Sequence, residues 1–118
     1  MRVLNIKNSD IPIKISFIDN LNKTFTLEIV NRSYDDCLIA HLYDKDNNLI
    51  AKNEKLIYGM PLFNYLYFDK NKNRNTIMPN LFLIPSTLSA EEELININNI
   101  GVNQFVSVVD LWSTSILT

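Results

Sequence analysis

The sequence predicts an all-β protein, a small sandwich or partly open barrel of about seven to nine short antiparallel strands. Apolar and polar residues alternate with a period of two along several segments, as they do in strands with one buried face. Turn-forming residues, mostly Asn and Asp, separate these segments at intervals of roughly ten residues. With 47% hydrophobic residues, we expect one β domain over residues 1–118, with residues 1–10 as an N-terminal arm and 113–118 as a flexible tail.

The first two strands are expected to form a hairpin. Between residues 11 and 17, three isoleucines and a phenylalanine alternate with Pro, Lys and Ser. Residues 19–22 form a turn, because Asp and Asn tolerate left-handed backbone conformations and bond their own backbone. A second alternating segment follows at 24–29 and supplies the partner strand.

The centre of the chain contains an apolar strand and the strongest turn signal. Residues 37–43 are apolar on both sides of the expected strand, which indicates burial on two faces or at an interface. The turn at 44–48 resembles the start of a calcium-binding loop, but such a loop also needs Gly and Glu where this chain has Leu49 and Lys55. A hairpin turn that leads into a strand at 49–51 is therefore the better interpretation.

Residues 55–63 do not fit a simple strand. Gly59 interrupts them and Pro61 cannot donate to a sheet ladder, so the segment is an edge, a bulge or a crossing between sheets. Residues 64–68 fit either a strand or a short helix, and the strand is favoured. Residues 69–75 contain no apolar side chain and predict an exposed loop.

The last third of the chain is expected to hold two strands. Residues 81–84 form a short buried strand, and residues 102–112 form the longest apolar strand after a turn at 98–101. At most one short helical turn is expected, near 89–93, where a Ser is followed three residues later by a Glu in a capping-box pattern.

Charge is distributed unevenly along the chain. After Arg74 there is no Lys or Arg, and after Glu93 the only charged residue is Asp110. A long uncharged β segment tends to pair with other chains unless something covers it. Either the core of this domain or another subunit provides that cover, and the sequence leaves both alternatives open.

Composition argues against several classes of function. The 11 basic and 13 acidic residues give a net charge of −2, without the basic excess of nucleic-acid binders. No apolar stretch is long enough to span a membrane, and the N-terminus lacks the apolar core of a signal peptide. The single cysteine, Cys37, makes no internal disulfide and supplies no metal-ligand pair, so no cofactor is expected.

No catalytic group of residues stands out either. His41 is the only histidine, and on one strand it would lie about 13 Å from Cys37, too far for a hydrogen bond. We therefore expect a protein that is not an enzyme. The remaining enzymatic alternative is a site at the mouth of a barrel with Asp35, Asp36 and His41.

The order of features from residue 25 to residue 111 resembles the plug-type baseplate proteins of contractile phage tails and phage-tail-like particles. A strand that ends in Asn31 is followed by the hairpin sequence Leu42-Tyr43-Asp44 and by Gly59-Met60-Pro61-Leu62. Asn99-Ile100-Gly101 then precedes the last strand. The same succession of a strand ending in Asn, a Leu-Tyr-Asp hairpin, a Gly-x-Pro-Leu segment and an Asn-Leu-Gly turn characterises that family.

The resemblance implies a structural role. Such a protein is a plug at the axis of the tail baseplate, where it closes the lower end of the tube and contacts hub, tube, spike or tape-measure proteins. It would assemble in the host bacterial cytoplasm into the virion or tail-like particle. Homo-oligomers are implied, with a trimer favoured, and no nucleic acid or membrane is among the partners.

A plug requires apolar contact surfaces, and aromatic residues and Met are enriched in such interfaces. The candidate interface residues are Tyr58, Met60, Leu62, Phe63, Tyr65, Tyr67, Phe105, Val108, Leu111 and Trp112. The alternative function is a small carbohydrate- or ligand-binding β module, in which exposed aromatic rings stack on sugars. Its candidate residues are Tyr34, Tyr58, Tyr65, Tyr67 and Trp112.

Overall fold

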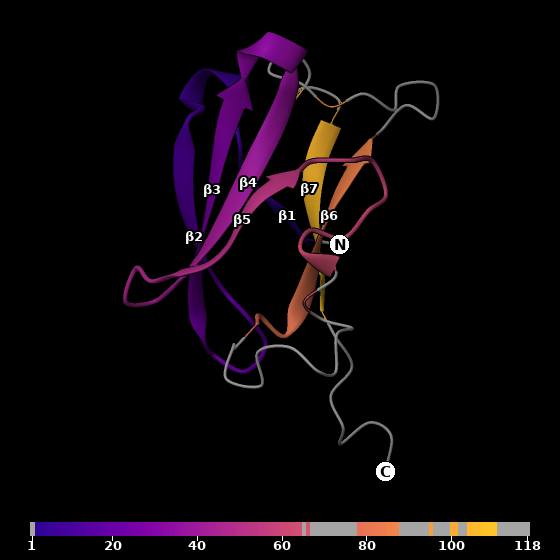
Figure 1. The fold of residues 1–118 in the computed structure, drawn as a ribbon. Coiled ribbons are helices and arrows are strands. Elements are labelled where there is room, and N and C mark those ends of the chain that lie inside the picture. The colour runs from indigo at the N-terminus through magenta and orange to yellow at the C-terminus, as the bar shows by residue number, and fades with distance from the viewer. Residues whose placement is uncertain are drawn as a thin grey trace.

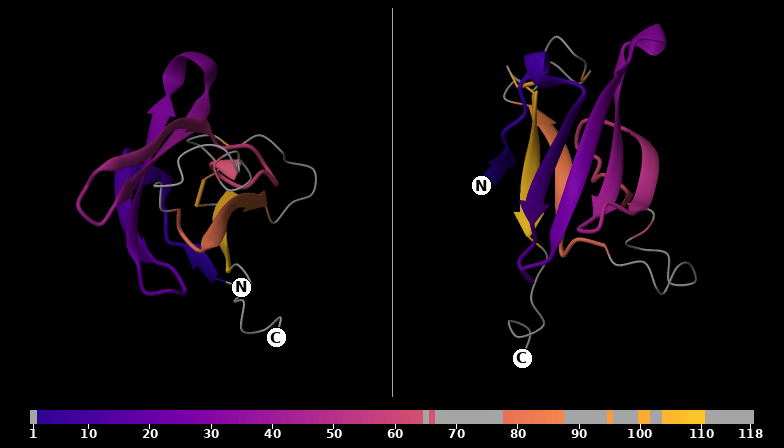
Figure 2. Two further views of the ribbon diagram at one scale, coloured as in Figure 1. Left: turned by 60° about the horizontal axis from the view of Figure 1, so that its bottom comes forward. Right: turned by 90° about the vertical axis from the view of Figure 1, so that its left-hand side faces the viewer.

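The computed structural model describes residues 2–64, 66, 78–87, 95, 100–101 and 104–110. Within these residues lie seven strands and two single-turn 3-10 helices, in the order β1 (Arg2–Leu4), η1 (Asn8–Asp10), β2 (Ile13–Ile18), β3 (Thr24–Arg32), η2 (Ser33–Asp35), β4 (Cys37–Asp44), β5 (Leu49–Lys55), β6 (Leu81–Thr87) and β7 (Gln104–Asp110). The strands form two antiparallel sheets, ordered β1-β7-β6 and β2-β3-β4-β5 (Figure 1). The sheets lie face to face without closing into a barrel (Figure 2), so the all-β prediction is confirmed in its sandwich form.

β2 and β3 form the predicted hairpin. They pair without interruption from Ile13 opposite Ile29 to Ile18 opposite Thr24. The Asp19 side chain holds the turn between them, because its Oδ1 accepts the backbone N–H groups of Leu21 and Lys23, each at 2.9 Å. The sequence pattern therefore identified both the strands and the residue type that closes the turn.

β4 is one of the two inner strands of the four-stranded sheet, between β3 and β5. Its first four residues, Cys37–Ala40, are all at most 4% exposed, so the predicted burial on both faces is confirmed there. The predicted turn at 44–48 is present, with the Asp44 backbone N–H bonded to the Asn48 carbonyl at 2.9 Å. β5 continues to Lys55, beyond the predicted strand, and its register against β4 shifts along the way.

Residues 56–63 cross from one sheet to the other, one of the alternatives that the sequence predicted. The Leu56 N–H donates to the Leu38 carbonyl in the four-stranded sheet at 3.0 Å. The Gly59 and Leu62 N–H groups then donate to carbonyls of β6, each at 2.8 Å. Figure 1 shows this segment leaving β5 and passing to the side of β6.

The strand favoured at 64–68 is wrong where the structure describes it, because Asn64 and Leu66 have helical backbone conformation. Phe63, at φ 59°, turns the chain just before them. Leu62 and Phe63 are buried and Leu66 packs against the core, and the Leu66 N–H donates to the Phe63 carbonyl at 3.0 Å, so the chain turns back on the core here. The Glu54 carboxylate further favours this turn, since it accepts the Phe63 N–H at 2.8 Å.

The three-stranded sheet brings the two ends of the described chain together. β7 pairs with β6 on one side and with β1 on the other. Residues 2–10, expected as an N-terminal arm, thus contain β1 and η1, and Leu4 and Ile6 are buried. The predicted strands at 81–84 and 102–112 are observed as the longer β6 and the shorter β7, and the helical turn near 89–93 lies outside the described residues.

One hydrophobic cluster fills the space between the sheets. Phe25, Leu27 and Leu42 contribute to it from the four-stranded sheet, and Leu81 and Val106 contribute from the three-stranded sheet. All five side chains are at most 2% exposed. Among the described residues, no helix has the length and hydrophobicity needed to cross a bilayer.

Candidate functional site

The outer face of the three-stranded sheet carries no charge in its described part. Cross-strand partners lie on the same face of a sheet, and the pairs Phe82–Val109, Ile84–Ser107, Ser86–Phe105 and Val3–Ser107 all lie on the side away from the core. We call this set the charge-free face: Val3, Phe82, Ile84, Ser86, Phe105, Ser107 and Val109. Val3 is 49% exposed and Val109 38%.

The two serines on the charge-free face use their polar atoms on each other. The Ser86 and Ser107 hydroxyl oxygens lie 2.6 Å apart, and Ser107 is only 4% exposed. A hydroxyl that is bonded within the protein requires no water, so the serines do not interrupt the apolar character of the face.

The outer face of the four-stranded sheet carries charged side chains, beside the exposed Ile18 and Leu49. The Tyr43 hydroxyl donates to Glu28 Oε1 at 2.8 Å, and the Lys14 ammonium lies 4.6 Å from the centre of the Tyr43 ring. The hydrogen bond to the carboxylate stabilises the protonated phenol and raises the pKa of Tyr43. The two outer faces of the sandwich therefore differ in charge, since one carries Lys14 and Glu28 and the described part of the other carries no charged side chain.

A second exposed apolar surface lies on the crossing segment. Ile57, Tyr58 and Met60 are 48%, 41% and 49% exposed, and they flank Gly59, which turns the chain at φ 75°. This exposed apolar run is bonded to β6 through the Gly59 N–H, so it lies beside the three-stranded sheet.

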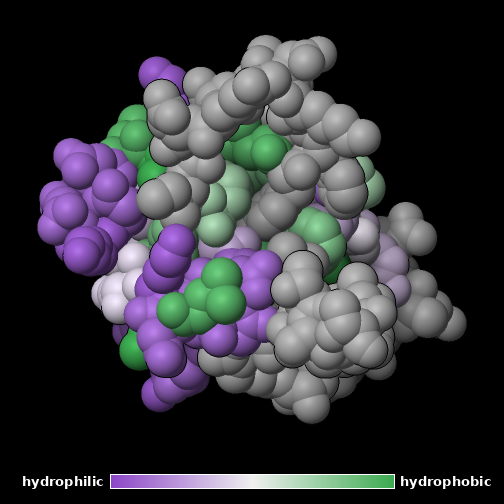
Figure 3. Space-filling model, turned by 90° about the horizontal axis from the view of Figure 1, so that it is seen from below, coloured by the Kyte–Doolittle hydropathy of each residue, from purple (hydrophilic) through white to green (hydrophobic). Residues whose placement is uncertain are grey.

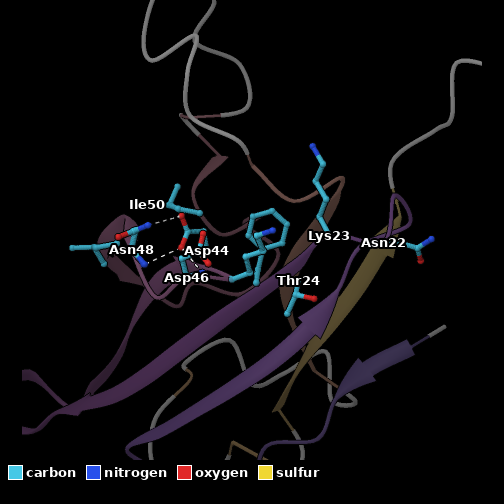
Figure 4. A pocket seen from close by; sticks show the side chains of 10 residues that line it. Asn22, Lys23, Thr24, Asp44, Asp46, Asn48 and Ile50 are labelled. Carbon is cyan, nitrogen blue, oxygen red and sulfur yellow. Dashed lines mark hydrogen bonds between the residues drawn. The ribbon is translucent and has the colours of Figure 1, made fainter.

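A hollow of about 510 Å³ opens where the turns of the β2–β3 and β4–β5 hairpins meet. Phe25, Leu49 and Ile50 supply its apolar lining, and Lys23 and Asp46 are among its polar lining residues (Figure 4). Figure 3 looks at this end of the molecule and shows hydrophobic surface between hydrophilic side chains.

Asp44, whose carboxylate lines the hollow, already accepts hydrogen bonds within the turn between β4 and β5. Asp44 Oδ1 accepts the backbone N–H groups of Asp46 and Asn48 at 2.9 and 2.8 Å, and Oδ2 accepts the Asn48 side-chain amide at 3.2 Å (Figure 4). These bonds, above all the backbone bond from Asn48, lower the pKa of Asp44. Within the described ranges, no group of three or more His, Cys, Asp or Glu residues is arranged to hold a metal ion.

Asp35, one residue of the enzymatic alternative, is held by two neighbours. Arg32 Nε and Nη2 donate to the two Asp35 oxygens at 2.9 and 2.6 Å, and this pairing lowers the pKa of Asp35 to about 2. The Cys37 thiol donates to Asp35 Oδ1 at 3.1 Å, while burial raises the pKa of Cys37 and keeps the sulfur protonated. The cluster fixes the entry into β4 and contains no activated nucleophile.

His41 has a structural partner of its own. Its Nδ1 accepts the backbone N–H of Asn53 at 3.1 Å, at the residue where β5 has a left-handed conformation of φ 63°. Asp36 also has a positive φ, 53°, in the turn before β4. Asp35 and His41 are therefore bonded to different neighbours, Asp35 in the turn before β4 and His41 at the bulge of β5.

The candidate interface residues named from the sequence fall into three groups. Tyr58 and Met60 are exposed and Phe105 is half-buried on the charge-free face. Leu62, Phe63 and Val108 are at most 6% exposed and pack in the core of this chain. Tyr65, Tyr67, Leu111 and Trp112 lie outside the described residues.

Val3, Ile84 and Val109 were missed as candidates. Residues 81–84 and 105–109 are apolar on both faces, so their alternation gives no signal for which side points outward. Phe105 and Val108 are an odd number of residues apart and therefore lie on opposite faces of β7. Val3 joins the face only because β1 pairs with β7, which the sequence does not reveal.

A family model described as "Cyanophage baseplate Pam3 plug gp18" matches residues 1–112. The match thus covers all of the described strands. No curated protein and no solved structure shows a significant match to the chain.

Proposed function

The chain belongs to the cyanophage baseplate plug family, and from this membership we propose that it is a structural, non-enzymatic plug at the axis of a contractile tail or tail-like particle. The plug would join the virion or particle during assembly in the host cytoplasm. The charge-free face is the observation in the structure that best supports a docking role.

The argument for docking through this face rests on desolvation. A charged side chain that enters an apolar contact without a partner costs several kcal/mol, roughly 3 or more. The charge-free face contains no such group, so it can be covered by another apolar surface without that cost. The exposed residues Ile57, Tyr58 and Met60 extend the apolar surface on the neighbouring crossing segment.

The proposed partners are other subunits of the tail, namely hub, tube and tape-measure proteins, and further copies of this chain. A trimer, which the resemblance to plug proteins implies, needs two different surfaces on each copy, because a three-fold contact is heterologous. The charge-free face and the crossing segment are two such surfaces.

A carbohydrate-binding module has less support. Tyr34 is 83% exposed, but the Arg32 guanidinium already lies 5.2 Å from its ring centre. Neither Tyr34 nor Tyr58 is among the described residues that line the 510 Å³ hollow. A sugar site would require aromatic rings in a concave surface.

We expect Val3→Lys to prevent incorporation of the chain into particles. The substitution places an unpaired charge on the charge-free face at a position that is 49% exposed, so the folded chain tolerates it but an apolar contact does not. The measurement is the amount of this protein in purified particles that assemble with the variant as the only copy, and we expect a decrease of roughly tenfold or more.

The matched control is Leu49→Lys. Leu49 is 50% exposed and lies on the outer face of the other sheet, as the partner of Tyr43. Circular dichroism should show both variants folded. Equal incorporation of the two variants would contradict docking through the charge-free face.

A further inference from the structure

In the part of the chain that the structure describes, four strands form the borders of the two sheets, and three of them are protected against pairing with another strand. β6 is covered by the Gly59 and Leu62 N–H groups, which donate to its carbonyls. β1 has only three residues. β5 is interrupted at Asn53, whose φ of 63° accompanies a shifted register. Short, covered or bulged borders are the usual ways in which proteins prevent edge-to-edge pairing.

β2 is the exception among these border strands. It has six residues in continuous register with β3, and it lies at the left-hand border of the molecule in Figure 1. Hydrogen-bonded and non-bonded pairs alternate along an antiparallel ladder. Because Asp19 donates its N–H to the Lys23 carbonyl at 2.9 Å, the alternation directs the backbone groups of Lys14, Ser16 and Ile18 away from β3.

These outward backbone groups have no partner among the described residues. The hydrogen bonds of the β2 segment outside the β2–β3 ladder are the Ser16–Thr26 hydroxyl contact at 3.2 Å and those of the turn at Asp19. Ile18 is 53% exposed at the end of the strand. The border of β2 thus presents three N–H and three C=O groups in the geometry that a further strand needs.

Lys14 is the only charged residue of β2, and its ammonium does not lie along this border, where it would oppose pairing with another strand. Lys14 reaches across β3, and its ammonium lies 4.6 Å from the centre of the Tyr43 ring on β4. On the other face, Ile13 and Ile15 pack against the core but remain half-buried. A further strand would therefore meet no charge and would cover the exposed parts of these isoleucines.

We propose that the occupant of this border is β2 of a second copy of the chain, paired antiparallel about a two-fold axis at Ser16. The four-stranded sheets of two copies then form one continuous sheet. The register places Lys14 opposite the partner's Ile18 and Ile15 opposite the partner's Phe17, so no like charges meet. The outward groups of the two strands match each other and form about six hydrogen bonds.

A second copy fits for two reasons. β2 of a second copy has the same six-residue length and the same alternation of apolar and polar side chains, and its Lys14 ammonium lies over its own sheet, away from the border. An isologous contact also leaves the charge-free face available on both copies. The inference goes beyond the proposed function and does not depend on it, because the β2 contact uses neither of the two surfaces proposed for the trimer. A trimer formed through those surfaces would be joined to a second trimer by the β2 contact, which gives an even number of copies.

Sedimentation equilibrium of the full-length chain tests the contact. We expect an even number of copies in the wild-type protein and half that number in Ser16→Pro. Proline removes the outward N–H at the axis, which has no bond to β3, so the hairpin keeps its own ladder. Ser16→Thr retains the N–H and should behave as the wild type. A wild-type monomer or trimer, or an unchanged mass for Ser16→Pro, would overturn the proposal.

Disulfide trapping gives a second test that does not depend on the folding of Ser16→Pro. The α carbons of a hydrogen-bonded antiparallel pair lie about 5.5 Å apart, within the range of a disulfide. Ser16→Cys should therefore form a covalent dimer under mild oxidation, while Lys14→Cys, which faces the partner's Ile18, should not. Equal trapping of both variants, or of neither, counts against the two-fold register. Buried Cys37 does not contribute, because it is 1% exposed.

Discussion

At the scale of single residues, Gly101 shows how close packing and backbone conformation can require glycine at one position. Its φ is 78°, and a β-carbon there would overlap the carbonyl oxygen of Ile6 and lie 3.1 Å from Lys7 Cα. Both neighbours belong to the backbone and cannot move as a side chain would. Gly101 thus keeps the segment after β1 close to the residues that lead into β7.

Gly101→Ala should destabilise the protein by about 3 kcal/mol, because the steric overlap adds to the cost of a positive φ. Gly59→Ala is the matched control, since Gly59 has a similar φ of 75° but open space around it. Only the conformational cost of about 1 kcal/mol applies there. Urea unfolding measures the free energy of unfolding of both variants. Equal decreases would show that the close contact with Ile6 adds no cost at position 101.

Asp35 makes a pH-dependent contribution to stability. Arg32 lowers its pKa from 3.8 to about 2 in the folded protein, so folding favours the ionised carboxylate. The contribution is therefore complete above the unfolded pKa and is lost as the pH falls from about 4 through 2. We expect the difference in free energy of unfolding between wild type and Asp35→Asn to shrink over this interval.

Urea unfolding at pH 6, 4 and 2.5 follows the Asp35 contribution directly. Asp44, whose pKa is also lowered, is present in both proteins and cancels in the difference. A difference that stays constant down to the lowest pH would show that the Arg32–Asp35 pair does not stabilise the fold.

At the scale of elements, a single side chain connects the β2–β3 hairpin to β6. Asp19 is 4% exposed, and besides its two bonds within the turn, its Oδ2 accepts the Asn80 backbone N–H at 3.0 Å. The Asn80 side-chain amide also donates to the Asn20 side-chain oxygen. The turn of one sheet is thereby fixed against the start of a strand in the other.

Asp19→Ala should destabilise the protein by about 3 kcal/mol, because it leaves three backbone N–H groups without their acceptor at a buried position. Asp46→Ala, in the exposed turn between β4 and β5, should change stability by less than about 0.5 kcal/mol. Thermal or urea unfolding of the two variants provides the comparison. Similar losses would mean that the link to Asn80 is dispensable.

Most of these elements could be predicted from local sequence. Alternation with a period of two located β2 and β3, a run apolar on both faces located β4, and the Asx turn at 44–48 located the start of β5, because each of these signals has a local physical cause. The strand favoured at 64–68 was wrong where it can be compared because the positive φ of Phe63 and the acceptor Glu54 depend on the tertiary structure. β1 was missed because its three residues are too few for a pattern.

At the scale of the whole molecule, the sandwich separates two surfaces of different chemistry. One sheet exposes Lys14, Glu28 and Tyr43, and the other exposes the charge-free face. The lack of charge in the last part of the sequence predicted that such a surface could exist. Its position could not be predicted, because the face combines the first strand with the last two, and only the register reveals which residues point outward.

The crossing segment 56–63 has a mechanical consequence. Its backbone is bonded to Leu38 in one sheet and to Leu83 and Pro85 in the other, so it bridges the two layers with covalent chain between the attachment points. Sliding of the two sheets past each other would therefore require these hydrogen bonds to break, in addition to the side-chain contacts of the core.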